Sequence, residues 1–283
     1  MPYHCPAKLN LFLGIEGLLP GGFHSLSTLM QRIGLCDELE ILPNRSGNLV
    51  LRCDISPTEK AEDNLVLKAA RLLKERAGIR ELGADILLKK RIPWGAGLGG
   101  GSSDAAGTLK YLNELWGLKI PLEELSSLAA RIGSDAPFFL GPPAAFCTGR
   151  GEIVKAVKPR ELYLLLFKPS ESLSTPRVYR QYDQWPRNSA SPEAFLKAYA
   201  EGDLDSLGKA LFNDLEAPAR ELLPALDKYL ASIRELTPYA AMSGSGTALF
   251  GLFKDLSSAG EAGLALSGLY PDASLTVTKT LIE

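Results

Sequence analysis

The stretch Pro93-Trp94-Gly95-Ala96-Gly97-Leu98-Gly99-Gly100-Gly101-Ser102-Ser103-Asp104 lies between a predicted strand (83–90) and a predicted helix that runs to about residue 116. Five of the seven residues from 95 to 101 are glycine, so the backbone N–H groups can close on a ligand without side chains in the way. The two serines add hydroxyl donors, and the start of the helix adds partial positive charge at the same point. These features together predict a phosphate-binding loop.

The type of phosphate loop is narrowed by what surrounds it. The sequence contains no G-x-x-x-x-G-K-[ST] motif, which excludes a Walker A loop. Gly95, Gly97 and Gly100 do satisfy G-x-G-x-x-G, but a dinucleotide fingerprint needs a further strand that ends in an acidic residue after the helix. The segment that begins at Pro121 predicts a helix instead, so a dinucleotide site is only the second interpretation.

Composition bounds the class of protein. The chain has 283 residues, which suits two domains, and its net charge of -2 gives no general attraction to nucleic acid or to an anionic membrane. Four cysteines without a C-x-x-C spacing and only two histidines argue against a cysteine or histidine metal site and suit a reducing compartment. No apolar run is long enough for a membrane span, and the first 15 residues do not resemble a signal peptide. We therefore expect a cytoplasmic protein.

Residues 7–15 alternate with a period of two and predict a strand. The pattern places an apolar set from Ala7 to Ile15 on one face, and Lys8, Asn10 and Phe12 on the other. Further along the chain, the same kind of reasoning predicts a mixture of strands and helices and a loop at 185–192. The expected segments are strands at 38–43, 48–55, 144–168, 247–253 and 274–282, and helices at 65–77, 121–133, 192–200, 203–212, 218–232 and 256–268.

Three segments in this order resemble the GHMP kinases: Pro6-Ala7-Lys8-Leu9-Asn10-Leu11, the glycine loop, and Met242-Ser243-Gly244-Ser245-Gly246. The resemblance implies an α+β fold of two domains, with an N-terminal domain of the ribosomal-protein-S5-like type and a C-terminal ferredoxin-like α/β sandwich. We place the domains at 1–155, which carries the glycine loop, and 156–283, which contributes to the substrate site. The family's chemistry is transfer of a phosphoryl group from ATP to a small-molecule hydroxyl.

Within the family, the chain is most similar to the members of the non-mevalonate isoprenoid pathway, whose substrate is a methylerythritol that carries a cytidine diphosphate group. The segments that carry this closer similarity are 21–26, 63–65, 99–104, 133–139, 174–176 and 213–214. Phe23 departs from the family's usual Tyr, which removes a hydroxyl but leaves a ring that can stack on a pyrimidine.

The resemblance assigns catalysis to Asp135 and Lys8. Phosphoryl transfer to an alcohol needs an acceptor for the hydroxyl proton, and a carboxylate within hydrogen-bond reach can fill that role. Asp135 is the expected base, although an aspartate in a Ser-Asp-Ala-Pro turn is more often a helix cap. Lys8 is the expected partner that keeps this carboxylate ionised, because a lysine on a mostly apolar strand needs an anion beside it.

The remaining expected residues bind ATP or the substrate. Asn64 and the loop from Pro93 to Ser103 are expected to bind ATP, and Mg²⁺ is implied by the charge of its phosphates, with ligands that the sequence does not identify. Asn10, Phe23, His24, Thr175, Ser243 and Gly244 are expected to bind the substrate. Phe23 and His24 are the expected nucleobase contacts, and Thr175 also serves as a helix N-cap before Pro176 in this interpretation.

Three other interpretations stay open at this point. The chain could be another GHMP kinase, acting on homoserine or phosphomevalonate. It could be a relative that uses ATP to decarboxylate a diphosphorylated acid. It could also be an RNA-contacting module, although it has no basic stripe. As partners we expect a small molecule with a cytidine diphosphate group, no nucleic acid and no membrane, and we expect a monomer or a weak homodimer.

Overall fold

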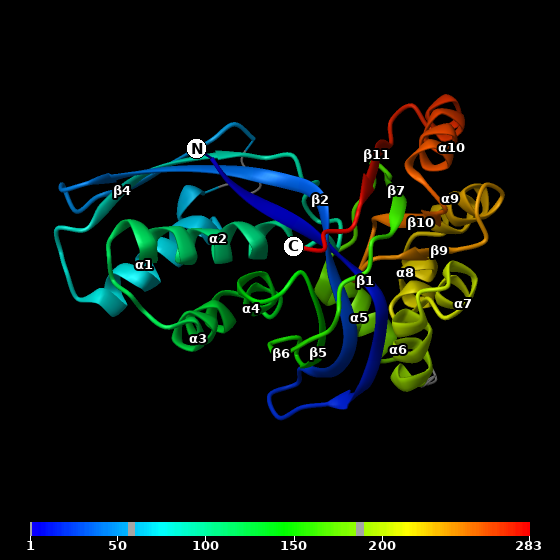
Figure 1. Ribbon diagram of the computed structural model, residues 1–283, viewed down its shortest axis with the longest axis horizontal. Helices are drawn as coiled ribbons and strands as arrows, with labels where there is room; N and C mark the ends of the chain where they lie inside the picture. Colours follow the sequence, from blue (N-terminus) through cyan, green and yellow to red (C-terminus); the bar gives the residue numbers. More distant parts are fainter. Residues whose placement is uncertain (1, 56–59, 185–189) are drawn as a thin grey trace.

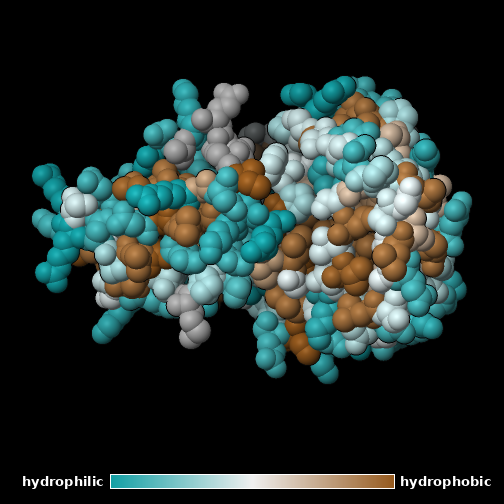
Figure 2. All heavy atoms as spheres, turned by 90° about the horizontal axis from the view of Figure 1, so that it is seen from above, coloured by the Kyte–Doolittle hydropathy of each residue, from teal (hydrophilic) through white to brown (hydrophobic). Residues whose placement is uncertain are grey.

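The computed structural model describes residues 2–55, 60–184 and 190–283 as an α+β protein with two sheets. The helices of the N-terminal half lie at one end of the long axis, and the sheet and helices of the C-terminal part lie at the other end (Figure 1). Seen from above, the molecule narrows at a waist between a slender part and a broader one (Figure 2). No helix among the described residues is long and apolar enough to span a membrane.

The larger sheet has seven strands and is built almost entirely from the N-terminal half. Its main path runs β3-β4-β2-β1-β8, and β5 pairs with both β2 and β6. The strands are β1 (Tyr3–Leu18), β2 (His24–Asn44), β3 (Leu49–Cys53), β4 (Gly83–Lys89), β5 (Ala144–Gly149), β6 (Ile153–Ala156) and β8 (Phe212–Asn213).

The long strand β2 pairs with two strands, β4 and β5, along one edge. Its residues 38–44 pair with β4, and its residues 26–31 pair with β5. The expected strands at 38–43 and 48–55 both form, but β3 does not pair with β2. It lies beyond β4 and runs parallel to it, because the chain crosses over after the turn at Asn44.

The helices of the N-terminal half follow their sequence signals closely. The expected helix at 65–77 is found at those residues, because Asn64 caps its start and Gly78 ends it at a φ of 69°. α2 begins at the end of the glycine loop and packs on β1, β2, α1, α3 and α4. The elements are η1 (Ala61–Asp63), α1 (Leu65–Ala77), α2 (Gly100–Leu115), α3 (Leu122–Ile132) and α4 (Ala136–Leu140).

The second sheet is antiparallel, with the strand order β11-β7-β10-β9. This order is the one expected of a ferredoxin-like α/β sandwich, and α9 and α10 pack on the sheet. Its strands are β7 (Tyr163–Lys168), β9 (Ala240–Met242), β10 (Leu249–Phe253) and β11 (Ser274–Lys279). The helices of this half are α5 (Thr175–Tyr182), α6 (Pro192–Glu201), α7 (Leu204–Lys209), α8 (Glu216–Leu222), α9 (Ala225–Arg234) and α10 (Leu256–Leu269).

The two sheets share part of one core. Ala7, Leu9 and Leu11 of β1 belong to the same buried cluster as Leu166 and Phe250 of the C-terminal sheet. In this way β1 is buried on both faces, which explains why its polar residues Lys8 and Asn10 are also shielded from solvent. Burial of each large apolar side chain contributes about 1.5–3 kcal/mol, so this shared cluster holds the two halves together.

The expected placement of Phe12 beside Lys8 and Asn10 is wrong. The pairing of β1 with β2 shifts register between Asn10 and Phe12, and this bulge turns Phe12 into the apolar core. There its ring lies 5.3 Å from the ring of Phe195 and 5.6 Å from the ring of Phe212.

Four further expectations need correction or stay open. The single helix expected at 218–232 is two helices, α8 and α9, because Pro224 interrupts the pattern. The N-cap of α5 is Ser174 and not Thr175, which is already the first helical residue. Most of the loop expected at 185–192 lies outside the described residues. The domain boundary at 155/156 falls at the end of β6, between the two sheets, and stays a prediction.

Candidate active site

A cleft with a volume of about 860 Å³ lies where the two halves meet. It is lined by the glycine loop, by β1 and β2, by the turn before α4, and by α5 and the loop after β9. All of the expected site residues contribute to its wall except Ser103 and Ser243, which are buried behind it. Because these segments come from both halves of the chain, the cleft exists only in the folded two-sheet protein.

Lys8 and Asp135 meet on the wall of this cleft. The Lys8 Nζ atom lies 3.4 Å from Asp135 Oδ2, and it also donates a hydrogen bond to Asn10 Oδ1. Lys8 is almost fully buried, whereas a third of the Asp135 side chain is exposed. The ammonium group therefore has its anion beside it, and the carboxylate keeps a face open to the cleft.

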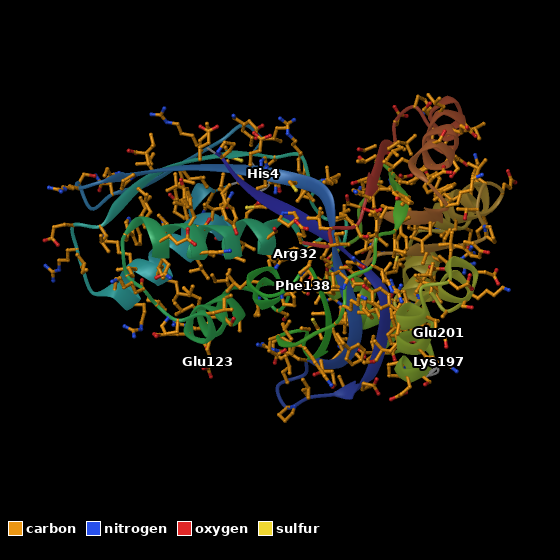
Figure 3. The ribbon with its side chains drawn as sticks, viewed as in Figure 1. His4, Arg32, Glu123, Phe138, Lys197 and Glu201 are labelled. Carbon is orange, nitrogen blue, oxygen red and sulfur yellow. The ribbon has the colours of Figure 1, made fainter. Side chains whose placement is uncertain are left out.

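Asp135 is held by the short helix α4, whose five residues are all buried. Arg32 of β2 donates hydrogen bonds of 3.0 Å and 2.8 Å to the backbone oxygens of Phe138 and Gly141. Its guanidinium also lies 5.5 Å from the centre of the Phe138 ring, and Figure 3 shows the two labelled residues together at the middle of the molecule. These contacts fix α4 and with it the position of Asp135. The sequence analysis identified neither α4 nor this role of Arg32.

The glycine loop is tied to both halves of the protein. The backbone N–H of Lys8 donates to Leu98 O at 2.9 Å, and the N–H of Ala248 donates to Ala96 O at 3.1 Å. Gly97 and Gly99 both have positive φ angles. A Cβ at Gly99 would lie 2.9 Å from the Phe139 ring and 3.0 Å from the Lys8 side chain, so the loop passes directly over the Lys8–Asp135 pair.

Asn64 lies at the far end of the loop. Its side chain accepts a hydrogen bond of 3.0 Å from the N–H of Val66, as an N-cap does, and it also lines the cleft. Asn64 is therefore the N-cap of α1, and its position in the cleft wall lets the same side chain face a ligand.

A buried group of three charges lies beneath the glycine loop. Lys90 Nζ contacts Asp37 and lies 2.8 Å from Asp104 Oδ2. Asp37 Oδ1 also accepts the N–H groups of Arg91 and Ile92, which lead into the loop. Burial raises the pKa of Asp104 to about 7, against the opposing effect of Lys90. This charge group was missed because its members are far apart in the sequence and no local pattern joins them.

Phe23 and His24 lie at the other end of the cleft. His24 Nε2 lies 2.8 Å from Asp183 Oδ1, and the His24 ring lies 4.8 Å from the ring of Tyr179. Phe23 is about half exposed, with a relative accessibility of 52%. Tyr179 was not identified from the sequence. Burial and, after it, the carboxylate of Asp135 raise the pKa of the Tyr179 hydroxyl, so the tyrosine stays neutral.

The loop after β9 closes the third side of the cleft. Thr175 Oγ1 and Ser245 Oγ are 2.7 Å apart, and both residues line the cleft. Ser243 Oγ donates to Gly97 O and accepts the N–H of Asn10, each at 3.2 Å, which links this loop to the glycine loop and to β1.

Asn213 fixes the loop after β9 from below. Its side-chain amide donates to Met242 O at 2.7 Å and to Gly244 O at 2.9 Å, and its oxygen accepts the N–H of Leu215.

Within the described ranges, no group of three or more His, Cys, Asp or Glu side chains could hold a metal ion.

Comparison with known proteins gives the family. Residues 64–141 match the model for the GHMP kinases N terminal domain, and residues 194–272 match the model for GHMP kinases C terminal. The chain is 41% identical to a 4-diphosphocytidyl-2-C-methyl-D-erythritol kinase from Synechococcus sp. (strain CC9605), over 89% of this chain and 87% of that protein. The chain belongs to the GHMP kinases.

Solved structures agree with that assignment. A crystal structure of a 4-(cytidine 5'-diphospho)-2C-methyl-D-erythritol kinase matches 99% of this chain and all of its own, with a TM-score of 0.83 and 36% identity. A mevalonate kinase structure covers the whole of both chains with a TM-score of 0.76 at 15% identity, which shows a shared fold alone. This protein therefore has the expected two-domain α+β fold of the GHMP kinases and is an ATP-dependent small-molecule kinase.

Proposed function

We propose that the protein transfers the γ-phosphoryl group of ATP to the 2-hydroxyl of 4-diphosphocytidyl-2-C-methyl-D-erythritol, a step in isoprenoid precursor synthesis. The observation that carries the proposal is the Lys8–Asp135 pair, which lies under the glycine loop and faces the cleft. The family relationship supports the substrate, since curated relatives that cover most of the chain carry this activity in their names.

In this mechanism Asp135 accepts the proton of the attacking hydroxyl group. The buried ammonium of Lys8 favours the ionised carboxylate and offsets negative charge that develops on the hydroxyl oxygen. The new bond joins that oxygen to the γ-phosphorus, the bond from the γ-phosphorus to the bridging oxygen breaks, and ADP leaves. Asn10, whose amide already contacts Lys8 and Thr28, holds Lys8 in place and faces the substrate.

The glycine loop and the first turn of α2 are the proposed phosphate cradle. Their backbone N–H groups and the helix N-terminus suit an anion, and the tight packing at Gly97 and Gly99 leaves room for no side chain there. Asn64 is the proposed contact to the adenine or the ribose of ATP. Ser243 and Gly244 of the facing loop are proposed to bind the substrate. The residues from Pro93 to Ser102 line the cleft beside them.

Mg²⁺ would accompany ATP and offset the charge of its phosphates. Since the described residues offer no acidic cluster, we propose that phosphate oxygens and water supply most of its ligands. At the opposite end, Phe23 and His24 are the proposed nucleobase contacts, with Thr175 near the polar groups of the substrate. We further propose a cytoplasmic location and a monomer or weak homodimer, which sedimentation velocity would check.

The test is ADP release from ATP and Mg²⁺ with each of three acceptors: 4-diphosphocytidyl-2-C-methyl-D-erythritol, homoserine and a phosphomevalonate. Turnover with the first alone is expected. Turnover with one of the others would assign a different GHMP kinase activity, and release of CO₂ from a diphosphorylated acid would assign a decarboxylase. Salt-sensitive RNA retention in place of any turnover would point to a binding module.

A further inference from the structure

The cleft carries few cations that are free to meet an anionic substrate. Lys8 is engaged by Asp135 and Asn10, and Lys90 is buried between two carboxylates. Two arginines remain in the wall, Arg150 and Arg180. A substrate that contains a diphosphate needs at least one such cation, because a desolvated phosphate without a partner is costly.

Arg150 lies between the two ends of the proposed substrate site. Its guanidinium carbon is 4.9 Å from the centre of the Phe23 ring, at the nucleobase end. The backbone of the same turn passes beside the proposed base, since a Cβ built on Gly151 would lie 3.5 Å from Asp135 Oδ1. Through the neighbouring residues Arg150 and Gly151, the β5–β6 turn therefore reaches both the nucleobase end of the cleft and its reacting end.

The guanidinium of Arg150 also keeps donors to spare. Its ion pair with Glu152 has an N–O distance of 3.7 Å, longer than a hydrogen bond, and both side chains are partly exposed. Among the described residues, no side-chain hydrogen bond is formed by this guanidinium; only the backbone N–H of Arg150 donates to Glu152, at 2.6 Å. Five N–H donors in a planar fork match two oxygens of a phosphate group.

The chemistry of the proposed substrate fixes the order of its parts. The diphosphate joins the cytidine to the 4-oxygen of the methylerythritol, so it lies between the nucleobase and the 2-hydroxyl. We propose that Arg150 binds the diphosphate of the substrate and makes the enzyme select a diphosphate-linked cytidine over a plain nucleoside. This inference rests on the proposed function, because that function supplies the substrate whose diphosphate Arg150 would bind.

The test compares two arginine variants of the full-length chain. Arg150→Gln removes the charge and the fork. Arg180→Gln is a matched control, because Arg180 lies in the same cleft wall and, among the described residues, the cation–π contact with the Phe23 ring is made by Arg150. Isothermal titration with CDP and with cytidine reports the affinity for the diphosphate separately from the affinity for the nucleoside. Arg150→Gln should weaken CDP binding by about tenfold to a hundredfold and cytidine binding by less than about twofold.

Steady-state kinetics give a second measurement. Arg150→Gln should raise KM for 4-diphosphocytidyl-2-C-methyl-D-erythritol by a similar factor and leave KM for ATP unchanged, and Arg150→Lys should restore part of the loss. An equal loss for CDP and cytidine would mean that Arg150 only holds the Phe23 ring, and it would overturn the proposal. A selective loss of CDP binding in Arg180→Gln instead would overturn it as well.

Failure of the broader proposal gives a different result. If the wild-type chain does not turn over 4-diphosphocytidyl-2-C-methyl-D-erythritol, the proposed function is wrong and the role of Arg150 is lost with it. If the wild type turns this substrate over and Arg150→Gln behaves like the wild type, the proposed function stands and only the role of Arg150 is wrong.

Discussion

Gly97 and Ser243 touch backbone to backbone: a Cβ built on Gly97 would lie 2.1 Å from the carbonyl oxygen of Ser243. The contact joins the glycine loop of the N-terminal half to the loop after β9 of the C-terminal half. Ser243 Oγ adds a hydrogen bond of 3.2 Å to Gly97 O. Two opposite walls of the cleft are therefore fixed against each other at this point.

Gly97→Ala should disable the enzyme, and Gly95→Ala should not. Both glycines have positive φ angles, which cost an alanine about 1–2 kcal/mol. At Gly95 the new Cβ would meet only the Ser172 side chain at 3.7 Å, whereas at Gly97 it would enter the backbone of Ser243. Gly97→Ala should therefore cost about 1–3 kcal/mol more and raise KM for ATP, as urea unfolding and kinetics would show. Equal behaviour of the two variants would contradict this contact.

Asp135→Asn should lower kcat by about 10²- to 10⁴-fold, because the amide cannot accept the hydroxyl proton. Because the substitution leaves the buried Lys8 ammonium without its anion, the variant should also unfold at a lower temperature than the wild type, whereas its ATP binding should stay close to normal. A kcat within a few-fold of the wild type would exclude Asp135 as the base.

Lys8→Met should also lower kcat, and its effect should not add to that of Asp135→Asn. If Lys8 acts through the carboxylate, kcat of the double variant should be only a little lower than kcat of the less active single variant. The measurement is a double-mutant cycle on kcat. Full additivity would show that Lys8 acts independently of Asp135.

Asp104 should make stability fall as pH rises towards 7. Burial raises its pKa to about 7 in the folded chain, above a value of about 3.9 for an unfolded chain. The folded state then binds more protons between these values, so the stability from this group is complete below about pH 4 and is lost as pH rises through about 7. Asp104→Asn should flatten the slope of the unfolding free energy between pH 5 and about 7.5, measured by urea denaturation.

The slope should flatten without vanishing. Burial also raises the pKa of Asp214 to about 6, although the N–H of Ile15 opposes the shift, and this group adds to the same trend. An unchanged slope in Asp104→Asn would mean that Lys90 keeps Asp104 ionised throughout this range.

Asn213→Ala should destabilise the protein by about 2–3 kcal/mol. The substitution removes three hydrogen bonds of a buried amide, and two of them hold the loop after β9. KM for both substrates should rise as that loop shifts, whereas Asn113→Ala, which removes two bonds far from the cleft at Ile120, should affect stability alone. Unchanged KM values in Asn213→Ala would show that the loop after β9 does not contribute to substrate binding.

Local signals in the sequence were enough for the helix α1 and for the glycine loop. The cap at Asn64 and the glycine at 78 bound α1, and the glycines around residue 97 need conformations that other residues avoid. The bulge that turns Phe12 inward depends on pairing with β2, so alternation along β1 could not show it. The break between α8 and α9 could have been predicted, because Pro224 is a helix-breaking residue. It was missed because the apolar residues on both sides of Pro224 keep a helical spacing.

The candidate site divides in the same way. Asp135 and Lys8 were predicted because each lies in a recognisable motif, and the structure places them 3.4 Å apart. Tyr179, Arg150 and the charges around Lys90 have no motif of their own. They become part of the site only when α5, the β5–β6 turn and α2 come together around one cleft, which depends on tertiary packing.

The short strand β8 has a consequence for how the chain can be divided. Phe212 and Asn213 come from the C-terminal half but pair with Phe12 and Leu13 in the N-terminal sheet. A cut after residue 156 would remove that strand from its sheet and expose the apolar face of β1. Separately expressed halves should therefore be poorly soluble alone and recover activity when produced together, so the protein is better suited to fragment complementation than to dissection into independent modules.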